Sequence, residues 1–149
     1  MATLVDNRKA SFNYELQDKY EAGVELLGYE VKSLKNKRGN LSGSYVVIRG
    51  NEAFLMGLDI PPYQANNTPD SYEQLRPRKL LLTKKELREL TEIENRKGLT
   101  LVPISLYNKG RNIKLEFAVG RGKKTRDKRQ TIQTREAKRD MERTLKKLR

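Results

Sequence analysis

Three short segments each bring together cationic side chains that could bind phosphate. These segments are residues 7–9 (NRK), 76–79 (RPRK) and 122–129 (GKKTRDKR). Guanidinium and ammonium groups donate charge-assisted hydrogen bonds to phosphate oxygens without selecting among bases. The chain has 32 Lys and Arg against 19 Asp and Glu, a net charge of +13. A polyanion is therefore the expected partner (RNA, DNA or an anionic membrane), with a solvated basic surface as the alternative.

The residue types of most catalytic and metal sites are missing from the 149 residues. The chain contains no Cys and no His, which excludes disulfides, zinc sites with thiolate or imidazole ligands, and Ser-His-Asp or Cys-His catalysis. An enzyme would need carboxylates with Mg²⁺. However, Asp59 and Asp70 stand alone, and the glutamates of 86–94 belong to one exposed helix face. We therefore predict a non-enzymatic protein with no cofactor and no metal.

Export and membrane insertion are not favoured by any segment. No apolar run approaches the ~20 residues of a membrane span, and residues 1–11 (MATLVDNRKAS) lack the apolar stretch of a secretory signal. The absence of Cys fits a reducing compartment. These features predict a cytoplasmic protein.

The positive charge is distributed unevenly along the chain. Residues 1–119 hold 19 basic and 15 acidic residues (+4), whereas residues 120–149 hold 13 basic and 4 acidic residues (+9). The last thirty residues have too few apolar side chains to offset an ordering entropy of ~1–2 kcal/mol per residue. We predict a folded domain over 1–119 and a basic tail over 120–149 that is disordered when free.

Period-two patterns and turn signals predict strands in the body. Residues 12–26 alternate between apolar and polar types, which indicates a long half-buried strand with Asp18 as a bulge. Residues 45–49 and 52–58 flank Gly50-Asn51, a two-residue hairpin signal. Residues 99–107 and 112–119 form a second predicted hairpin around Lys109-Gly110.

Two helices and one long loop complete the body. Residues 29–37 predict a short helix with Val31 and Leu34 facing inward, ended by Gly39. Residues 83–97 begin with a capping box and end before Gly98. Residues 60–74 are rich in Pro and Asn and predict a loop. The fold class is mainly β with short helices, arranged as a small closed barrel that leaves no open sheet edge.

Four segments, taken together and in order, resemble one known family. They are NRKA at 7–10, YEAG at 20–23 with GYEVKSL at 28–34, RPRKLLL at 76–82, and GKKTRDKR at 122–129. In this order and at these distances the chain resembles the small protein B (SmpB) family of SsrA-binding proteins. The resemblance runs from about Asn7 to the C-terminus.

The resemblance implies a fold and a role. The implied fold is a six-stranded antiparallel OB-like barrel with a few helices. The family binds the tRNA-like domain of transfer-messenger RNA and delivers it to stalled ribosomes for trans-translation. Its tail occupies the decoding centre of the small subunit and the empty mRNA channel, where it becomes helical. The partners implied are thus transfer-messenger RNA and the small-subunit rRNA, and the protein is expected to act as a monomer.

The resemblance also carries roles to individual positions. Those implied to bind transfer-messenger RNA are Asn7, Arg8, Lys9, Glu21, Gly23, Lys32, Arg76, Arg78, Lys79, Leu81 and Lys114. Those implied to act in the ribosome-binding tail are Arg121, Gly122, Lys123, Lys124, Arg126, Asp127, Lys128, Arg129, Thr144 and Leu145. Leu81 is also explained by core packing, Glu21 by an ion pair with a lysine, and Lys32 by a solvated helix face.

Three tail positions depart from the family pattern. The family often has Lys where Arg121 stands, which preserves the charge. It often has an aromatic or His where Arg126 stands, and a guanidinium plane can also stack on a base. Thr144 weakens an apolar pair, which leaves Leu145 as the main contributor. From Ala137 the apolar residues of the tail recur at helical spacing, so a helix forms on binding or the tail stays unstructured.

Other readings of the same residues lead to different partners. A ribosomal or translation-factor OB-type protein would bind rRNA structurally, without transfer-messenger RNA. A basic amphipathic tail could also lie on anionic lipid, although its apolar stripe lacks any Trp or Phe.

Overall fold

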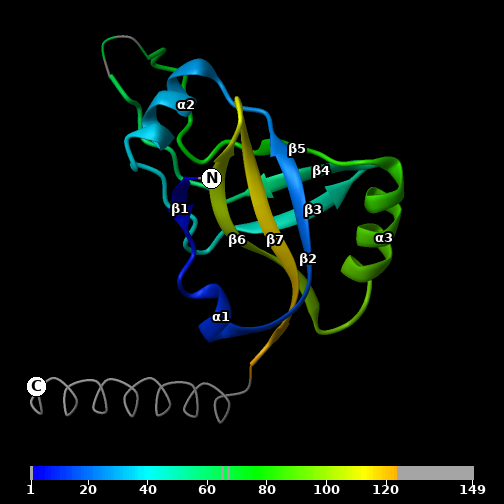
Figure 1. Cartoon of the computed structure of the whole chain (residues 1–149). Helices are drawn as coiled ribbons and strands as arrows, with labels where there is room; N and C mark the ends of the chain where they lie inside the picture. Colours follow the sequence, from blue (N-terminus) through cyan, green and yellow to red (C-terminus); the bar gives the residue numbers. More distant parts are fainter. Residues whose placement is uncertain (1, 65, 67, 124–149) are drawn as a thin grey trace, which may run out of the picture.

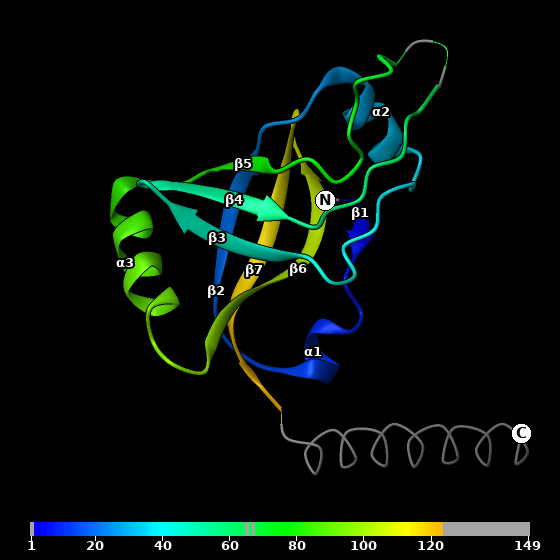
Figure 2. The ribbon, with the colours of Figure 1, turned by 180° about the vertical axis from the view of Figure 1, so that it is seen from behind.

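The structure is a computed structural model that describes residues 2–64, 66 and 68–123. Its elements are β1 (Thr3–Asp6), α1 (Ala10–Asn13), β2 (Tyr14–Val24), α2 (Gly28–Lys35), β3 (Tyr45–Arg49), β4 (Glu52–Met56), β5 (Arg78–Leu81), α3 (Lys84–Glu94), β6 (Leu99–Lys109) and β7 (Asn112–Gly122). Figures 1 and 2 show the strands curling around one core, with the helices at its periphery. In the described residues, no helix is long and apolar enough to cross a membrane.

Six of the strands pair antiparallel in a closed ring. Following the pairings, β6 joins β3, then β4, β5, β2 and β7 in turn, and β7 pairs back onto β6. This agrees with the predicted OB-like architecture. β1 is an additional strand that sequence analysis did not predict, because its four residues are too few for a clear periodicity. It pairs with residues 105–107 of β6, so the sheet has seven strands in the described residues.

The predicted turns are confirmed. Gly50 and Asn51 both have positive φ (57° and 64°), as a two-residue hairpin turn requires. The β3–β4 register then pairs Val47 with Phe54 across the turn. Gly110, at φ 63°, reverses the chain between β6 and β7. Each reversal joins consecutive strands, so local sequence was enough to predict it.

The long strand is shorter than predicted and starts differently. β2 covers Tyr14–Val24 rather than 12–26, because residues 10–13 form the single-turn helix α1 before it. The predicted bulge is present: the register with β7 shifts between Leu16 and Lys19, so three steps on β2 oppose two on β7.

Local capping defines both longer helices. α3 begins at a capping box in which Thr83 Oγ1 accepts from the Glu86 amide at 3.2 Å. α2 ends in a Schellman motif, with the Lys37 amide bound to Leu34 O and the Arg38 amide bound to Ser33 O. Lys37 (φ 61°), and not the predicted Gly39, takes the left-handed position after this helix.

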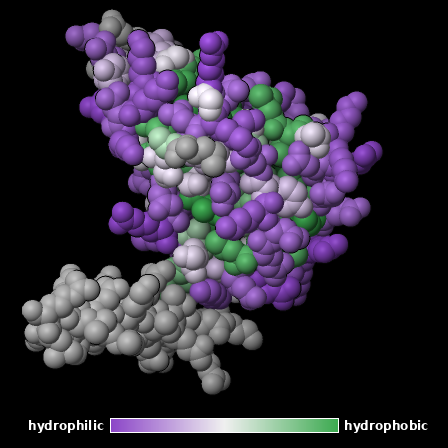
Figure 3. All heavy atoms as spheres, viewed as in Figure 1, coloured by the Kyte–Doolittle hydropathy of each residue, from purple (hydrophilic) through white to green (hydrophobic). Residues whose placement is uncertain are grey.

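The barrel interior is an apolar core drawn from every strand of the ring. Its fully buried members include Leu55, Leu101, Leu106, Leu115 and Phe117. Leu34 of α2 and Leu90 of α3 close the core from outside the sheet. On the face drawn in Figure 3, apolar side chains emerge only as separate patches among hydrophilic ones. Any contact between the barrel and a partner therefore involves the side chains on the outer side of the strands.

The body extends further along the chain than predicted. β7 runs to Gly122, and Tyr14 of β2 pairs with Gly122 at its end. The Lys123 amide then donates to Asn13 O at 2.9 Å, and its Nζ donates to Ser11 O at 2.9 Å. The folded body therefore includes residues 120–123, beyond the predicted end at Val119. The predictions for 124–149, including Lys124, Arg126, Asp127, Lys128, Arg129, Thr144 and Leu145, fall outside the described residues.

Candidate nucleic-acid interface

Strand register brings four residues on the outer side of the sheet into one line across the barrel; Leu81 is exposed and Lys114 half-buried, whereas Gly23 and Tyr107 are buried. Leu81 of β5 pairs with Gly23 of β2, Gly23 with Lys114 of β7, and Lys114 with Tyr107 of β6. We call this line the Gly23 row. Three of its members, Gly23, Leu81 and Lys114, were identified from the sequence although they are far apart along the chain. The fourth, Tyr107, was missed because its role depends on a contact across β7.

Leu81 points outward and is not part of the core. Its neighbour Leu80 is 2% exposed, whereas Leu81 is 52% exposed. The core-packing explanation for Leu81 is therefore wrong. A Cβ placed on Gly23 would lie 3.4 Å from Leu81 Cβ and Cδ1, so the glycine lets Leu81 lie flat across β2. The result is an exposed apolar side chain next to Gly23, on the opposite side of β2 from Lys114.

Glu21 lies one outward position away from the Gly23 row and is held by two donors. The Tyr107 hydroxyl donates to Glu21 Oε2, and Lys109 Nζ donates to Oε1 at 3.0 Å. Hydrogen bonds from Tyr107 and then Lys109 lower the pKa of Glu21 below its usual value. Burial and the bond to Glu21 raise the pKa of Tyr107. The cluster therefore keeps an ionised acceptor in a fixed orientation on the outer side of the sheet.

Replacing Tyr107 by Phe should raise the pKa of Glu21 toward its ordinary value, because the strongest bond to the ionised form is lost. In the native protein the carboxylate stays charged as pH falls, and its stabilising bonds are lost only as pH drops through the lowered folded-state pKa. In the variant this loss should begin at higher pH. An NMR titration of the Glu21 carboxyl measures both, and Tyr45→Phe serves as the matched control because Tyr45 is exposed and lies outside this cluster.

Arg78 is buried and cannot contact a phosphate from its position in the fold. Its guanidinium binds Glu30 Oε2 through Nη2 at 2.5 Å and Leu58 O through Nη1 at 2.6 Å, and both Arg78 and Glu30 are 0% exposed. The prediction that Arg78 binds RNA is therefore wrong. It fails because a matching buried carboxylate makes the inward side of β5 the lower-energy place for this charge.

The Glu30 carboxylate joins α2 to the long loop and to β5. Oε1 accepts from the Leu27 amide at 2.8 Å, and Arg76 also donates to it. Burial would raise the pKa of Glu30, but the bonds from Arg76, the Leu27 amide and Arg78 outweigh it and lower the pKa. The Tyr72 hydroxyl donates to Glu30 Oε2 at 3.0 Å. Burial, together with the charge of Glu30, raises the pKa of Tyr72 to about 12.

Sequence spacing contained a signal for this buried carboxylate. Glu30 lies four residues before the inward-facing Leu34, so both share one face of α2. The network includes Arg76, whose side chain is 28% exposed, so Arg76 is only partly free for another ligand. Of the predicted 76–79 cluster, Lys79 remains on the outer face, in an exposed ion pair with Glu52 at 3.3 Å.

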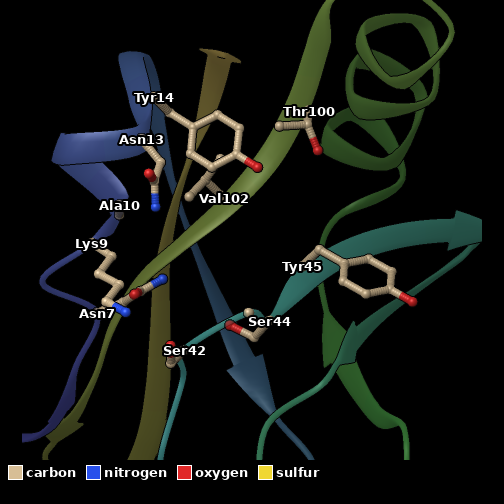
Figure 4. A pocket seen from close by; sticks show the side chains of 11 residues that line it. Asn7, Lys9, Ala10, Asn13, Tyr14, Ser42, Ser44, Tyr45, Thr100 and Val102 are labelled. Atoms are coloured by element: carbon tan, nitrogen blue, oxygen red, sulfur yellow. The ribbon is translucent and has the colours of Figure 1, made fainter. Parts of the chain in front are cut away.

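The other predicted residues lie at the opposite end of β2. Gly23 and Tyr14 are nine residues apart, which is roughly 30 Å along a strand. Around Tyr14 is a hollow of about 460 Å³ whose lining includes Asn7, Lys9, Asn13, Tyr14 and Tyr45. Figure 4 shows the two tyrosine rings on either side of it. We call it the tail-root hollow because Lys123 binds the adjacent α1.

Asn7 is partly committed to the fold. Its Nδ2 donates to Pro103 O at 2.9 Å, which uses one of its two amide hydrogens. Arg8, Lys9 and Arg121 are exposed near this end, and Gly122 is exposed where β7 ends. Lys32 is exposed on α2, at the other end of the molecule. The structure thus places one group of predicted residues at the Gly23 row and another at or near the tail-root hollow, whereas Lys32 and Arg78 belong to neither.

Comparisons with known proteins identify the family of the chain. The family model described as "SmpB protein" matches residues 4–147. An SsrA-binding protein of Chloroflexus aggregans is 43% identical over 147 residues, covering 99% of this chain and 93% of that protein. One of Thermosynechococcus vestitus is 46% identical over 143 residues, covering 96% and 94%.

A solved structure leads to the same family. A chain from the work described as "tmRNA-SmpB: a journey to the center of the bacterial ribosome" superposes with a TM-score of 0.67 at 40% identity. The match covers 80% of this chain and 84% of that one. Together with the near-complete matches in sequence, this shows that the chain belongs to the SmpB protein family.

Proposed function

We propose that this protein binds the tRNA-like domain of transfer-messenger RNA and delivers it to stalled ribosomes for trans-translation. The observation that carries the proposal is the Gly23 row, in which register alone assembles residues from β5, β2 and β7 into one outer face. The relatives named above as SsrA-binding proteins support the choice of RNA. The protein acts in the cytoplasm as a binding protein and catalyses no reaction itself.

The Gly23 row offers complementary chemistry to an RNA surface. Lys114 supplies positive charge for phosphate, and Leu81 supplies an apolar surface for a base or ribose. Glu21 repels phosphate but can accept from base amines or a 2′-hydroxyl. Because Tyr107 and Lys109 fix its orientation, Glu21 selects the part of the RNA that presents donors at that point.

The tail-root hollow and the tail form the ribosome-facing part of the proposal. The tail leaves the body beside Tyr14 and Asn13, so the decoding centre would lie next to the hollow. Its two tyrosine rings provide faces on which bases can stack. We propose that residues 124–149 enter the decoding centre and the empty mRNA channel, with Arg121 and Gly122 at the entrance.

Isolation of the full-length protein from bacterial cells, followed by identification of the bound RNA, tests the proposal directly. Transfer-messenger RNA should be enriched over bulk rRNA after a wash with nuclease inhibitor and moderate salt. Recovery of rRNA alone would instead favour a structural rRNA-binding protein and contradict the proposal.

Affinity for the tRNA-like domain should fall steeply with salt, because phosphate neutralisation releases counterions. Lys114→Gln should reduce the slope of log K against log salt by about 0.7–0.9, the contribution of one phosphate contact. Lys85→Gln is the matched control, since Lys85 is exposed on α3 and away from the Gly23 row. Filter-binding titrations at four salt concentrations measure the slopes. If the slope for Lys114→Gln equals that of the native protein, Lys114 does not contact a phosphate and is not part of the interface.

A further inference from the structure

A second hollow lies where β2 and β5 separate. The two strands pair only at Gly23–Leu81 and Val24–Leu80, and their last backbone hydrogen bond joins the Glu25 amide to Lys79 O at 2.9 Å. Beyond it, β2 turns into α2, while the chain before β5 turns toward the long loop (Figure 1). The separation leaves a hollow of about 600 Å³, which we call the β2–β5 hollow.

The walls of the β2–β5 hollow are held by one buried carboxylate. On one wall, the Leu27 amide donates to Glu30 Oε1. On the other, Arg76 and Arg78 bind the same carboxylate through their guanidinium groups. Since both walls are tied to Glu30, their separation is set before any ligand arrives. A preformed hollow lowers the entropy lost on binding.

The lining combines apolar side chains with two cations, Arg76 and Lys79, and one carboxylate, Glu25. Leu27 is 41% exposed although it is large and apolar, and Phe54 and Pro77 lie in the same hollow. Lys79 lies at the β5 rim, and its exposed ion pair with Glu52 is a weak competitor for another anion. Glu25 lies at the β2 rim and disfavours an anion there. The charges thus orient a ligand that has an apolar flat part and one negative group.

The β2–β5 hollow is continuous with the Gly23 row. Lys79 and Leu81 are alternate residues on β5, and both face outward. Leu81 and its register partner Gly23 each lie two residues from a residue that lines the hollow, Lys79 on β5 and Glu25 after β2. An RNA that contacts the Gly23 row would bring its backbone past the rim of the hollow.

We propose that the β2–β5 hollow receives one unpaired nucleotide of the bound RNA. The base lies against Leu27 and Phe54, and its phosphate lies at Lys79. Unstacked bases of single-stranded loops are what such apolar and aromatic sites bind, whereas a duplex keeps its bases inside. The inference rests on the proposed function, because the nucleotide belongs to that RNA.

Binding of the labelled tRNA-like domain to the full-length protein, followed by fluorescence anisotropy, tests the inference. Leu27→Ala and Phe54→Leu should each weaken binding by about 10-fold, in the range expected for loss of one base-stacking contact. Leu75→Ala is the matched control, since Leu75 is 60% exposed and lies outside the hollow. It should change affinity by less than about 2-fold. Thermal unfolding of each variant separates a binding defect from a folding defect.

An abasic scan of the RNA identifies the nucleotide. One unpaired position should weaken binding to the native protein when its base is removed, yet should not weaken binding to Leu27→Ala further. If the native protein binds the RNA but no such position exists, or if both hollow variants bind normally, the inference is wrong and the proposed function stands. If the native protein does not bind this RNA, the proposed function fails as well.

Discussion

Replacing Arg78 by Met is expected to lower the free energy of unfolding by about 3–5 kcal/mol, the cost of leaving a buried charge without its partner. Arg78 and Glu30 are both 0% exposed, and Arg78 also satisfies Leu58 O and Gln74 O. Removal of the guanidinium would leave these acceptors unpaired inside the barrel. Urea unfolding followed by circular dichroism measures the change.

Two further variants locate the cause of this loss. Arg76→Met should cost less, because the Arg76 side chain is 28% exposed and water can replace it. The double variant Glu30→Leu/Arg78→Met should be more stable than Arg78→Met alone, since no fully buried charge remains and Arg76, which loses its partner Glu30, is partly exposed to water. Where Arg78→Met remains folded at low temperature, its RNA affinity should be close to native. If Arg78→Met had native stability but no longer bound RNA, Arg78 would contact the RNA, and the conclusion that it serves only to stabilise the fold would be wrong.

Truncation after Lys123 is expected to keep binding of the tRNA-like domain while reducing peptide tagging on stalled ribosomes to background. The removed residues 124–149 hold 11 basic and 4 acidic residues, a charge of +7 out of +13. Affinity should therefore fall mainly in its salt-dependent part. The Gly23 row and Glu21 lie entirely within the retained body. Anisotropy with the RNA and a tagging assay on a non-stop message measure the two activities.

The truncation must keep residues 120–123, because these residues pair with the rest of the barrel. Truncation after Val119 would remove the pairs of Gly120 with Thr100 and of Arg121 with Leu99, and the bonds from Lys123 to α1. It should destabilise the barrel and weaken RNA binding for a structural reason. The pair of truncations therefore forms its own control. Collapse of RNA binding in a stably folded chain cut after Lys123 would show that the division between body and tail is wrong.

Local patterns in the sequence determined much of the scaffold. Gly50-Asn51 and Gly110 predicted both hairpins because a turn depends only on residues adjacent in the chain. Thr83 and Glu86 predicted the start of α3 for the same reason. Charge composition, which needs no three-dimensional information, shows that the last thirty residues carry +9 of the +13 net charge and predicts a basic tail there.

The tertiary structure alone decided what each strand presents outward. Alternation in 78–81 places Arg78 with Leu80 and Lys79 with Leu81, but it does not say which pair faces the core. Glu30, 48 residues away, settles this by accepting the Arg78 charge inside the barrel. Leu81 consequently lies outside, beside Gly23, and becomes available to a ligand.

The end of the body and the assembly of its outer face were likewise tertiary outcomes. Residues 120–123 resemble the tail in composition, yet pairing with β2, β6 and α1 makes them part of the fold. Tyr107 reaches Glu21 only because the barrel closes through β7. Composition, turns and motifs were thus readable in the chain itself, whereas the choice of inward and outward faces required the long-range partners that stabilise them.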